Sequence, residues 1–342
     1  MTDETVQVAH VGLGAIGREV VRLMLHRRGF RLVAACDVNA ELVGSSLAAA
    51  LGEDLAEDVT VVERLADALP RVDGNDLVVT HTTSSSLTRC LPELLAAVEL
   101  GASVVSSCEE LSYPWLQAPE AAAALDGAAR AAGVSVVGTG VNPGFAMDFL
   151  PIVLSGAAKR VDSVTVHRVQ DAGRRRLPLQ AKVGAGISAE EFERRVTERT
   201  IGHVGLTESA QAVADALGWI NGADLVTTET IEPVLAQTAV PSGLGAIETG
   251  RVTGIDQVAV VTVAGTERVR LRLTMAVGSG PSRDDIWLAG DPDLHLSVPR
   301  GLHGDLATAA TLVNTIGSIR HAQPGLRVMS ELRPPRPAPV LA

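Results

Sequence analysis

The stretch GLGAIG at residues 12–17 follows an apolar β-branched run and leads directly into a helical pattern. Gly12, Gly14 and Gly17 have the G-x-G-x-x-G spacing in the strand–turn–helix context that dinucleotide binding requires. The first glycine permits a tight turn, the second lets a pyrophosphate approach the backbone, and the third allows close helix–strand packing. Phosphates then rest at the positive end of the helix. This feature predicts a dinucleotide-binding βαβ unit; the alternative is a glycine-rich turn in an α/β fold that binds no nucleotide.

Short β-branched runs alternate with Ala- and Leu-rich helical patterns through the first part of the chain. This alternation predicts an α/β fold over residues 1–148, a Rossmann dinucleotide-binding domain whose parallel sheet has helices on both faces. The expected strands are 5–11, 31–37, 59–63, 76–80, 102–107 and 134–137. The expected helices are 15–28, 40–52, 85–100 and 117–132.

The rhythm changes in residues 149–303, where the connections between strand-like runs become longer. This part is predicted to form a second, α+β domain built on a mostly antiparallel sheet. Its expected strands are 163–170, 257–265 and 268–278, and its expected helices are 188–198 and 206–217.

The C-terminal part divides into a helix and a tail. Residues 304–330 contain an amphipathic helix at about 304–317, which we expect to return to the first domain. Residues 331–342 are rich in proline, which lacks the N–H group that helices and strand ladders need. We expect this tail to be disordered.

Charge and cysteine usage narrow the class of protein. With 342 residues the chain is long enough for two well-buried domains. Its 40 acidic and 29 basic residues give a net charge of −11, which argues against nucleic acid or an anionic membrane as a partner. Cys36, Cys90 and Cys108 share no metal-ligand spacing and cannot all pair. They predict buried thiols in a reducing cytoplasm, and nothing in the sequence requires a metal.

Asp37 ends the expected second strand, about 20 residues beyond the glycines. A carboxylate at this place accepts hydrogen bonds from the adenosine ribose and repels a 2′-phosphate. The sequence therefore predicts NAD in preference to NADP, while Arg18 and Asn39 leave the use of NADP open.

The stretch THTTSSSL at residues 80–87 follows the fourth expected strand at its carboxyl end. In open α/β sheets that edge faces the ligand crevice, so Thr82, Thr83 and Ser84 can offer hydroxyls and helix-start amides to a cofactor. The alternative is that residues 84–86 cap the following helix.

Three further stretches lie where strands are expected to end: CEELSYPW at 108–115, GTGVNPGFAMD at 138–148 and HRVQDAGRRRLPLQAKVGAG at 167–186. The first contains two adjacent carboxylates and the only tyrosine, the second a sharp turn at the domain junction, and the third a cluster of basic residues. Taken singly they are also compatible with a capped helix, a hinge and a solvated loop.

Taken together, these motifs resemble the NAD(P)-dependent amine dehydrogenases related to 2,4-diaminopentanoate dehydrogenase, distant relatives of dihydrodipicolinate reductase. The resemblance covers nearly the whole chain outside the tail and includes GHVGLTES at 202–209 and GLHGDLATAATLVN at 301–314. It implies reversible oxidative deamination of an amine, or reductive amination of a ketone or aldehyde with ammonia, by hydride transfer. It also implies a homodimer formed through the sheet of the second domain.

The resemblance assigns roles to individual residues. In this family a glutamate after the fifth strand lies over the nicotinamide and handles the proton of the amine; motif position gives this role to Glu109. Glu110 is the alternative, because neighbours in an extended chain point to opposite sides and only one can face the cofactor, while the other caps a helix or pairs with an arginine. The expected cofactor-binding residues are Gly12, Gly14, Ala15, Ile16, Gly17, Asp37, Thr82, Thr83 and Asn142. The expected substrate-binding residues are Asn142, Arg168, Gln170, His303 and Tyr113, although the family pattern favours asparagine at position 170.

Two rival functions remain at this point. One is an imine reductase of the dihydrodipicolinate reductase type, whose DAPSG-like loop has no counterpart here, although Lys182 could act as its proton donor. The other is a nicotinamide-binding sensor that has lost catalysis. A carbonyl-plus-ammonia activity would separate an enzyme from a sensor.

Overall fold

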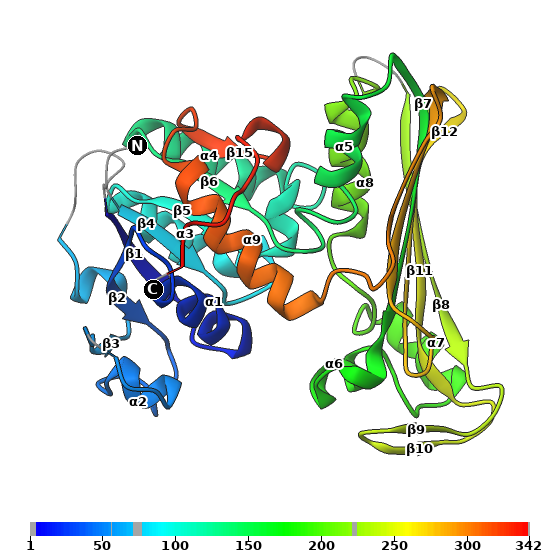
Figure 1. Ribbon diagram of the computed structural model, residues 1–342, viewed down its shortest axis with the longest axis horizontal. Helices are drawn as coiled ribbons and strands as arrows, with labels where there is room; N and C mark the ends of the chain where they lie inside the picture. The colour runs from blue at the N-terminus through cyan, green and yellow to red at the C-terminus, as the bar shows by residue number, and fades with distance from the viewer. Residues whose placement is uncertain (1–4, 56, 71–76, 221–223, 341–342) are drawn as a thin grey trace. The chain divides into compact units, whose positions relative to one another are not determined.

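The computed structural model describes residues 5–55, 57–70, 77–220 and 224–340 (Figure 1). The chain divides into two compact units. One consists of Met1–Phe145 together with His303–Ala342, and the other of Ala146–Leu302. Each unit is built around its own large sheet.

The first unit contains a seven-stranded sheet in the order β15-β6-β5-β4-β1-β2-β3. All neighbouring strands are parallel, which confirms the predicted Rossmann-type fold. The connections change direction between β1 and β4, the point at which ligands bind outside the carboxyl ends of such sheets. The strands are β1 Val6–Val11, β2 Phe30–Cys36, β3 Val61–Val62, β4 Leu77–His81, β5 Ser103–Ser106, β6 Ser135–Gly138 and β15 Gly325–Arg327.

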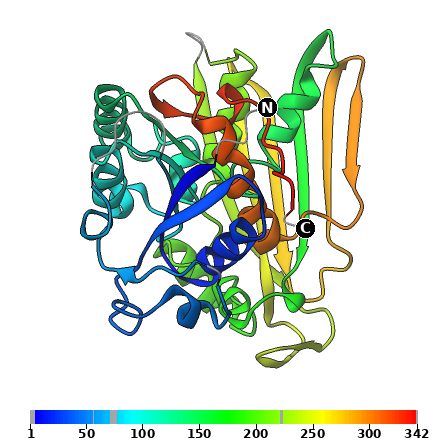
Figure 2. The same ribbon diagram turned by 60° about the vertical axis from the view of Figure 1, so that its left-hand side comes forward.

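Two pairs of helices cover this sheet (Figures 1 and 2). Helix α1 (Ala15–Leu25) packs beside α9 (Gly304–Ile319), and α3 (Leu87–Glu99) packs beside α4 (Pro119–Ala132). Successive strand side chains point to opposite faces. A hydrophobic core lies between the sheet and the pair α3 and α4, and buried residues such as Val20 of α1 and Leu312 of α9 face inward in the other pair. The short helices of this unit are α2 Leu47–Leu51, η1 Leu65–Asp67, η2 Glu109–Ser112 and η4 Met329–Glu331.

The helix expected over residues 40–52 is much shorter than predicted. Residues 40–45 form turns, and Gly44 has a φ of 83°, in the left-handed region that a helix cannot use. Helix α2 begins only after Ser46, whose hydroxyl accepts a hydrogen bond from the Ala49 amide at 3.1 Å. An alanine-rich pattern overstated the helix because the turn chemistry before it was not recognised.

The second unit contains a six-stranded sheet in the order β14-β13-β7-β12-β11-β8. The pair β7–β12 is parallel and the other four pairs are antiparallel, so the sheet is mixed but mostly antiparallel, as predicted. Helices α5 and α8 pack on one face of it (Figure 1). Its strands are β7 Arg160–Asp171, β8 Leu225–Leu235, β11 Val252–Val263, β12 Thr266–Ala276, β13 Arg283–Asp291 and β14 Leu294–Val298.

Smaller elements complete the second unit. They are α5 Phe149–Ser155, η3 Ala172–Arg174, α6 Leu177–Lys182, α7 Ala189–Thr197, α8 Leu206–Ala216 and the two-stranded ribbon of β9 Val240–Ser242 and β10 Gly245–Ile247. The sequence analysis missed β8, β13 and β14. Strand β8 is an edge strand rich in Thr and Glu, and β13 opens with Arg-Asp-Asp, so neither shows the apolar pattern of a buried strand.

The prediction of a disordered tail is wrong for the described residues up to 340. The Arg28 amide donates to the Pro339 carbonyl at 2.8 Å, and Arg27 forms an isolated antiparallel bridge with Val340. The Arg27 guanidinium also donates to the Ala338 carbonyl at 2.9 Å. Proline has no N–H group but keeps its carbonyl, so a proline-rich segment can still accept hydrogen bonds from the connection between α1 and β2.

Across the described ranges, none of the helices combines the length and the apolar character that crossing a membrane demands.

Candidate active site

The turn after β1 has the geometry that its three glycines predict. Gly12 has a φ of 95°, and a Cβ there would lie 2.8 Å from the Thr82 carbonyl oxygen. A Cβ on Gly17 would lie 1.7 Å from the Gly12 oxygen, whereas a Cβ on Gly14 would meet nothing within 4 Å. Gly14 is also the residue before α1 and provides no side-chain cap. Ala15 and Ile16 are the first two residues of α1. The space next to this helix start is open at Gly14, which suits a pyrophosphate.

Two side chains form hydrogen bonds with the carbonyl of Gly12. His10 Nε2 lies 2.8 Å from this oxygen, and the Thr82 hydroxyl donates to it at 2.8 Å. Burial lowers the pKa of His10 to about 4, so the imidazole is neutral. Because a carbonyl only accepts, the proton is on Nε2, and Nδ1 accepts from the Thr80 hydroxyl at 2.8 Å. The sequence analysis missed His10; a histidine inside the apolar strand before the turn was the available signal.

Asp37 joins the end of β2 to the same turn. Its Oδ2 accepts from the Leu13 amide at 2.6 Å, and its Oδ1 accepts from the Asn39 amide at 2.8 Å. Each carboxylate oxygen has a further lone pair, so these bonds leave it able to accept from a ligand hydroxyl. The carboxylate thus has both a structural task and the position that ribose recognition requires.

A cavity of about 570 Å³ lies within the first unit along these elements. Its volume is typical of a cofactor site. Five of the residues predicted to bind the cofactor line it, namely Gly12, Gly14, Asp37, Thr82 and Thr83. The rest of its wall comes from residues at the end of β1, after β2, near η1 and on α3: Val11, Cys36, Val38, Glu63, Arg64, Leu65, Ala66, Pro92, Glu93 and Ala96. The residues therefore fit part of a dinucleotide, with the open side of Gly14 and the Asp37 carboxylate in one cavity.

The hydroxyls of Thr82 and Thr83 are engaged inside the protein. Thr82 donates to Gly12, and Thr83 donates to Glu93 Oε2 at 2.7 Å. Both residues lie at the cavity wall as expected, but their hydroxyls hold the wall together. The alternative role for the serines also differs from the structure, because the Ser86 side chain does not cap α3.

The cap of α3 is Glu110. Its Oε2 accepts from the Leu87 amide at 2.7 Å, and its own amide donates to the Ser85 carbonyl at 3.2 Å. Glu109 and Glu110 are not in the extended segment that was predicted, because residues 109–112 form the 3₁₀ turn η2. The two acids nevertheless differ in role, and Glu110 has the helix-capping role that the sequence analysis reserved for one of them.

Glu109 begins η2 three residues after the end of β5, and it is half-buried. Its carbonyl accepts from the Ser112 hydroxyl at 2.7 Å, which closes the turn. Tyr113 follows, buried, with its ring 5.1 Å from that of Trp115 in an edge-to-face contact. A Cβ on Gly138, at the end of β6, would lie 2.4 Å from the Leu111 backbone, so the turn packs directly on the neighbouring strand.

The predicted substrate residues are divided between the two units. Tyr113, Asn142 and His303 belong to the first unit, and Arg168 and Gln170 to the second. Asn142 is buried in the turn after β6 and does not line the cofactor cavity. His303 caps α9, with Nδ1 accepting from the Leu306 amide at 3.5 Å.

Arg168 is only 2% exposed and is held inside the second unit. Its guanidinium pairs with Asp284 and donates to the Leu302 carbonyl at 2.7 Å, while Asp284 Oδ2 accepts from the Leu302 amide at 2.7 Å. The pair thus holds the backbone of Leu302 on both sides. Gln170 is 4% exposed, and its amide donates to the Val169 carbonyl at 3.1 Å.

Comparison with known proteins identifies the family. The family described as 2,4-diaminopentanoate dehydrogenase C-terminal domain matches residues 145–339, and the one described as dihydrodipicolinate reductase, N-terminus, matches residues 6–107. A 2,4-diaminopentanoate dehydrogenase from Acetoanaerobium sticklandii is 31% identical over 340 residues, which cover 97% of this chain and 95% of that protein. The chain belongs to the 2,4-diaminopentanoate dehydrogenase family.

Solved structures agree with this family in fold. An amine dehydrogenase from Mycobacterium smegmatis superposes with a TM-score of 0.79 at 24% identity, covering 98% of each chain. The WlbA dehydrogenase from Bordetella pertussis, solved with NADH and UDP-GlcNAcA, gives a TM-score of 0.52 at 16% identity, covering 94% of this chain and 89% of that one. The two-unit architecture is therefore one that other dehydrogenases share.

Gly17→Ala and Gly14→Ala test the turn as a matched pair. We expect Gly17→Ala to lower the free energy of unfolding by about 1–3 kcal/mol, because its Cβ collides with the Gly12 carbonyl. Gly14→Ala should keep wild-type stability yet weaken dinucleotide binding, because its methyl group occupies the pyrophosphate approach. Denaturant unfolding and fluorescence titration with the dinucleotide measure the two effects. Equal stability of the two variants, or undiminished binding by Gly14→Ala, would contradict this account.

Proposed function

We propose that the protein is an NAD(P)-dependent amine dehydrogenase that interconverts an amine and a ketone or aldehyde plus ammonia. One observation carries the proposal: a relationship to a 2,4-diaminopentanoate dehydrogenase that spans 97% of this chain coincides with a cavity, walled by the glycine turn and Asp37, that fits part of a dinucleotide. Bound in that cavity, a nicotinamide dinucleotide would supply or accept the hydride. The side chains of the protein would orient the substrate and transfer the protons.

Glu109 is the proposed proton-transfer group. In the amination direction it donates the proton with which the carbinolamine hydroxyl leaves as water, giving the iminium that is then reduced to the amine. In the deamination direction its carboxylate takes protons back as water adds. The structure supports this choice over Glu110, because the Glu110 carboxylate is already bound to the start of α3.

The imine reductase is the weaker candidate for a specific reason. The match to the dihydrodipicolinate reductase family ends at residue 107, within the cofactor-binding half, whereas residues 145–339 match the diaminopentanoate dehydrogenase domain. Lys182, the proton donor considered for that rival, lies exposed at the end of α6. An exposed ammonium is a poor candidate for a tuned acid, which requires a desolvated position.

The two acids can be separated by matched substitutions. We expect Glu109→Gln to lower kcat for reductive amination by roughly 10²–10⁴-fold, the usual contribution of a general acid–base group, with cofactor affinity and melting temperature unchanged. Glu110→Gln should instead lower the free energy of unfolding by about 0.5–2 kcal/mol, the usual loss on removing a helix cap, with a small effect on kcat. Steady-state amination, cofactor titration and thermal unfolding distinguish the two patterns. An inactive Glu110→Gln beside an active Glu109→Gln would reverse the assignment.

We also propose that NAD is the preferred cofactor. The Asp37 carboxylate lines the cavity and repels a 2′-phosphate, so wild-type kcat/KM should be higher with NAD than with NADP. Asp37→Asn keeps an acceptor for the Leu13 amide but removes the charge, and it should shift the NAD:NADP ratio of kcat/KM toward NADP by about tenfold or more. A wild-type enzyme that prefers NADP would refute the role given to Asp37.

A homodimer formed through the second-unit sheet is the proposed assembly. The face opposite α5 and α8 carries Trp287, 39% exposed, whose ring stacks on His295 at a centroid distance of 4.9 Å. Val258 and Val260 on β11 add half-buried apolar surface to the same face. On that face Thr165 of β7 and Arg270 of β12 lie between Trp287 and Val260. A sheet face that mixes an exposed aromatic side chain and aliphatic side chains with polar ones is typical of an interface.

Sedimentation velocity tests this assembly. The wild-type chain should sediment as a dimer, and Trp287→Glu should give a monomer because a charge replaces an apolar contact. Leu177→Glu, at a 49% exposed position on α6, is the matched control and should remain dimeric. A monomeric wild-type protein, or a Trp287→Glu variant that stays dimeric, would exclude this interface.

A further inference from the structure

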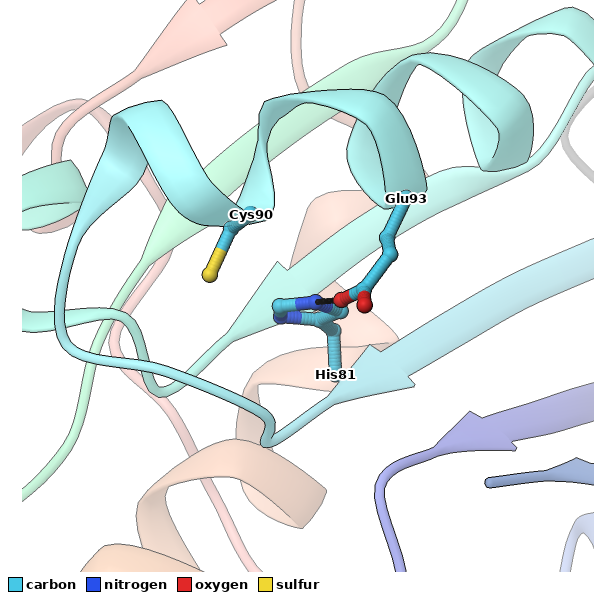
Figure 3. A group of neighbouring side chains, drawn as sticks. All are labelled: His81, Cys90 and Glu93. Atoms are coloured by element: carbon cyan, nitrogen blue, oxygen red, sulfur yellow. Dashed lines mark hydrogen bonds and ion pairs between the residues drawn. The ribbon is translucent and has the colours of Figure 1, made fainter. Parts of the chain in front are cut away.

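Three side chains with metal-binding chemistry meet beside the cofactor cavity in the first unit (Figure 3). His81 is the last residue of β4, and Cys90 and Glu93 lie three residues apart on α3, so both project from one side of that helix. One ligand atom from each lies within 4.8 Å of the others. We propose that His81, Cys90 and Glu93 bind a divalent metal ion of the zinc type.

The donor set selects this class of ion. Zinc accepts thiolate sulfur, imidazole nitrogen and carboxylate oxygen in a tetrahedral arrangement, whereas calcium and magnesium prefer oxygen alone. With metal–ligand bonds of about 2.0–2.3 Å, tetrahedral ligand atoms lie roughly 3.3–3.7 Å apart. His81 Nε2 and Glu93 Oε2 now lie 2.8 Å apart, so they must separate slightly to admit an ion. The Glu93 side chain is 37% exposed and has room to move, whereas His81 is buried and fixed.

The surroundings of His81 suit a metal ligand. Nδ1 lies 2.8 Å from the Ser106 hydroxyl, on the side away from Glu93. When Nε2 binds a metal, the neutral ring carries its proton on Nδ1 and donates it to Ser106, while Cys90 releases its thiol proton to solvent. Ser106 also accepts from the Cys108 amide at 3.1 Å, which fixes its position. An acceptor that binds the other ring nitrogen in this way orients metal-bound histidines in general.

The fourth coordination position faces the cavity. The Thr83 hydroxyl lies 3.0 Å from His81 Nε2, 2.7 Å from Glu93 Oε2 and 3.6 Å from Cys90 Sγ, so it is surrounded by all three ligands. Thr83 and Glu93 both line the cofactor cavity. The fourth ligand is therefore the Thr83 hydroxyl or a water molecule that enters from the cavity, as in sites with three protein ligands.

Metal titration of the chelator-treated protein tests the proposal without measuring activity. We expect one equivalent of Zn²⁺ to bind, in competition with a chromophoric chelator. One equivalent of Co²⁺ should give the thiolate-to-cobalt charge-transfer absorption and the strong visible bands of a tetrahedral site. Cys90→Ser should abolish the charge-transfer absorption, and Ser106→Ala should weaken Zn²⁺ binding by about 10–100-fold while keeping it.

The matched control is Cys36→Ser. Cys36 is a buried thiol of the same unit whose sulfur donates to the Glu63 carbonyl, outside the cluster. This variant should keep both the stoichiometry and the cobalt spectrum. Wild-type protein that binds neither ion, or a thiolate–cobalt band that survives in Cys90→Ser, would overturn the proposal and leave the three side chains as a hydrogen-bond network joining α3 to β4.

Discussion

The carbonyl of Gly12 is the point on which the first unit depends. It accepts hydrogen bonds from buried His10 and from Thr82, and the closeness of Gly17 leaves no room for any side chain beside it. Asp37 fixes the next amide, Leu13, from the end of β2. Protein atoms therefore fill the inner side of the turn. On its outer side, nothing lies within 4 Å of a Cβ built on Gly14. A rigid turn with one open side is what a pyrophosphate needs in order to approach the backbone.

The loop between β4 and α3 is also fixed by side chains that bind neighbouring backbone and side-chain groups. Thr82 holds this loop to the glycine turn, Thr83 holds it to Glu93, and Glu110 caps the helix that follows. Polar side chains that the sequence suggests as ligand contacts are thus first needed to satisfy backbone groups at strand and helix ends. The same loop also brings together the residues of the proposed metal site, His81 at the end of β4 and Cys90 and Glu93 on α3.

How much the sequence predicts depends on how far apart the interacting residues lie. The glycine turn and Asp37 were predictable because both lie within one βαβ unit, and the fold of the first domain was predictable because its alternation repeats that local pattern. His10 pairs with Thr80 at a separation of 70 residues, and Glu110 caps a helix 23 residues earlier. These long-range partners are set by the order of the strands in the sheet, and the residues next to them in the sequence give no sign of them. Edge strand β8 was missed because its Thr and Glu residues carry no apolar signal.

Arg168, which the sequence predicts to bind substrate, also has partners inside the second unit. Its guanidinium and Asp284 are almost fully buried, and together they bind both the amide and the carbonyl of Leu302, the residue before the cap of α9. Removing one partner of such a pair leaves an uncompensated buried charge, which typically costs about 3–5 kcal/mol. Removing the Arg168 guanidinium would therefore remove a hydrogen bond from the Leu302 backbone as well as any contact that the side chain makes with a substrate. A substrate-binding measurement on a folded Arg168 variant therefore tests the predicted substrate role separately from the hydrogen bonds that Arg168 and Asp284 make to Leu302.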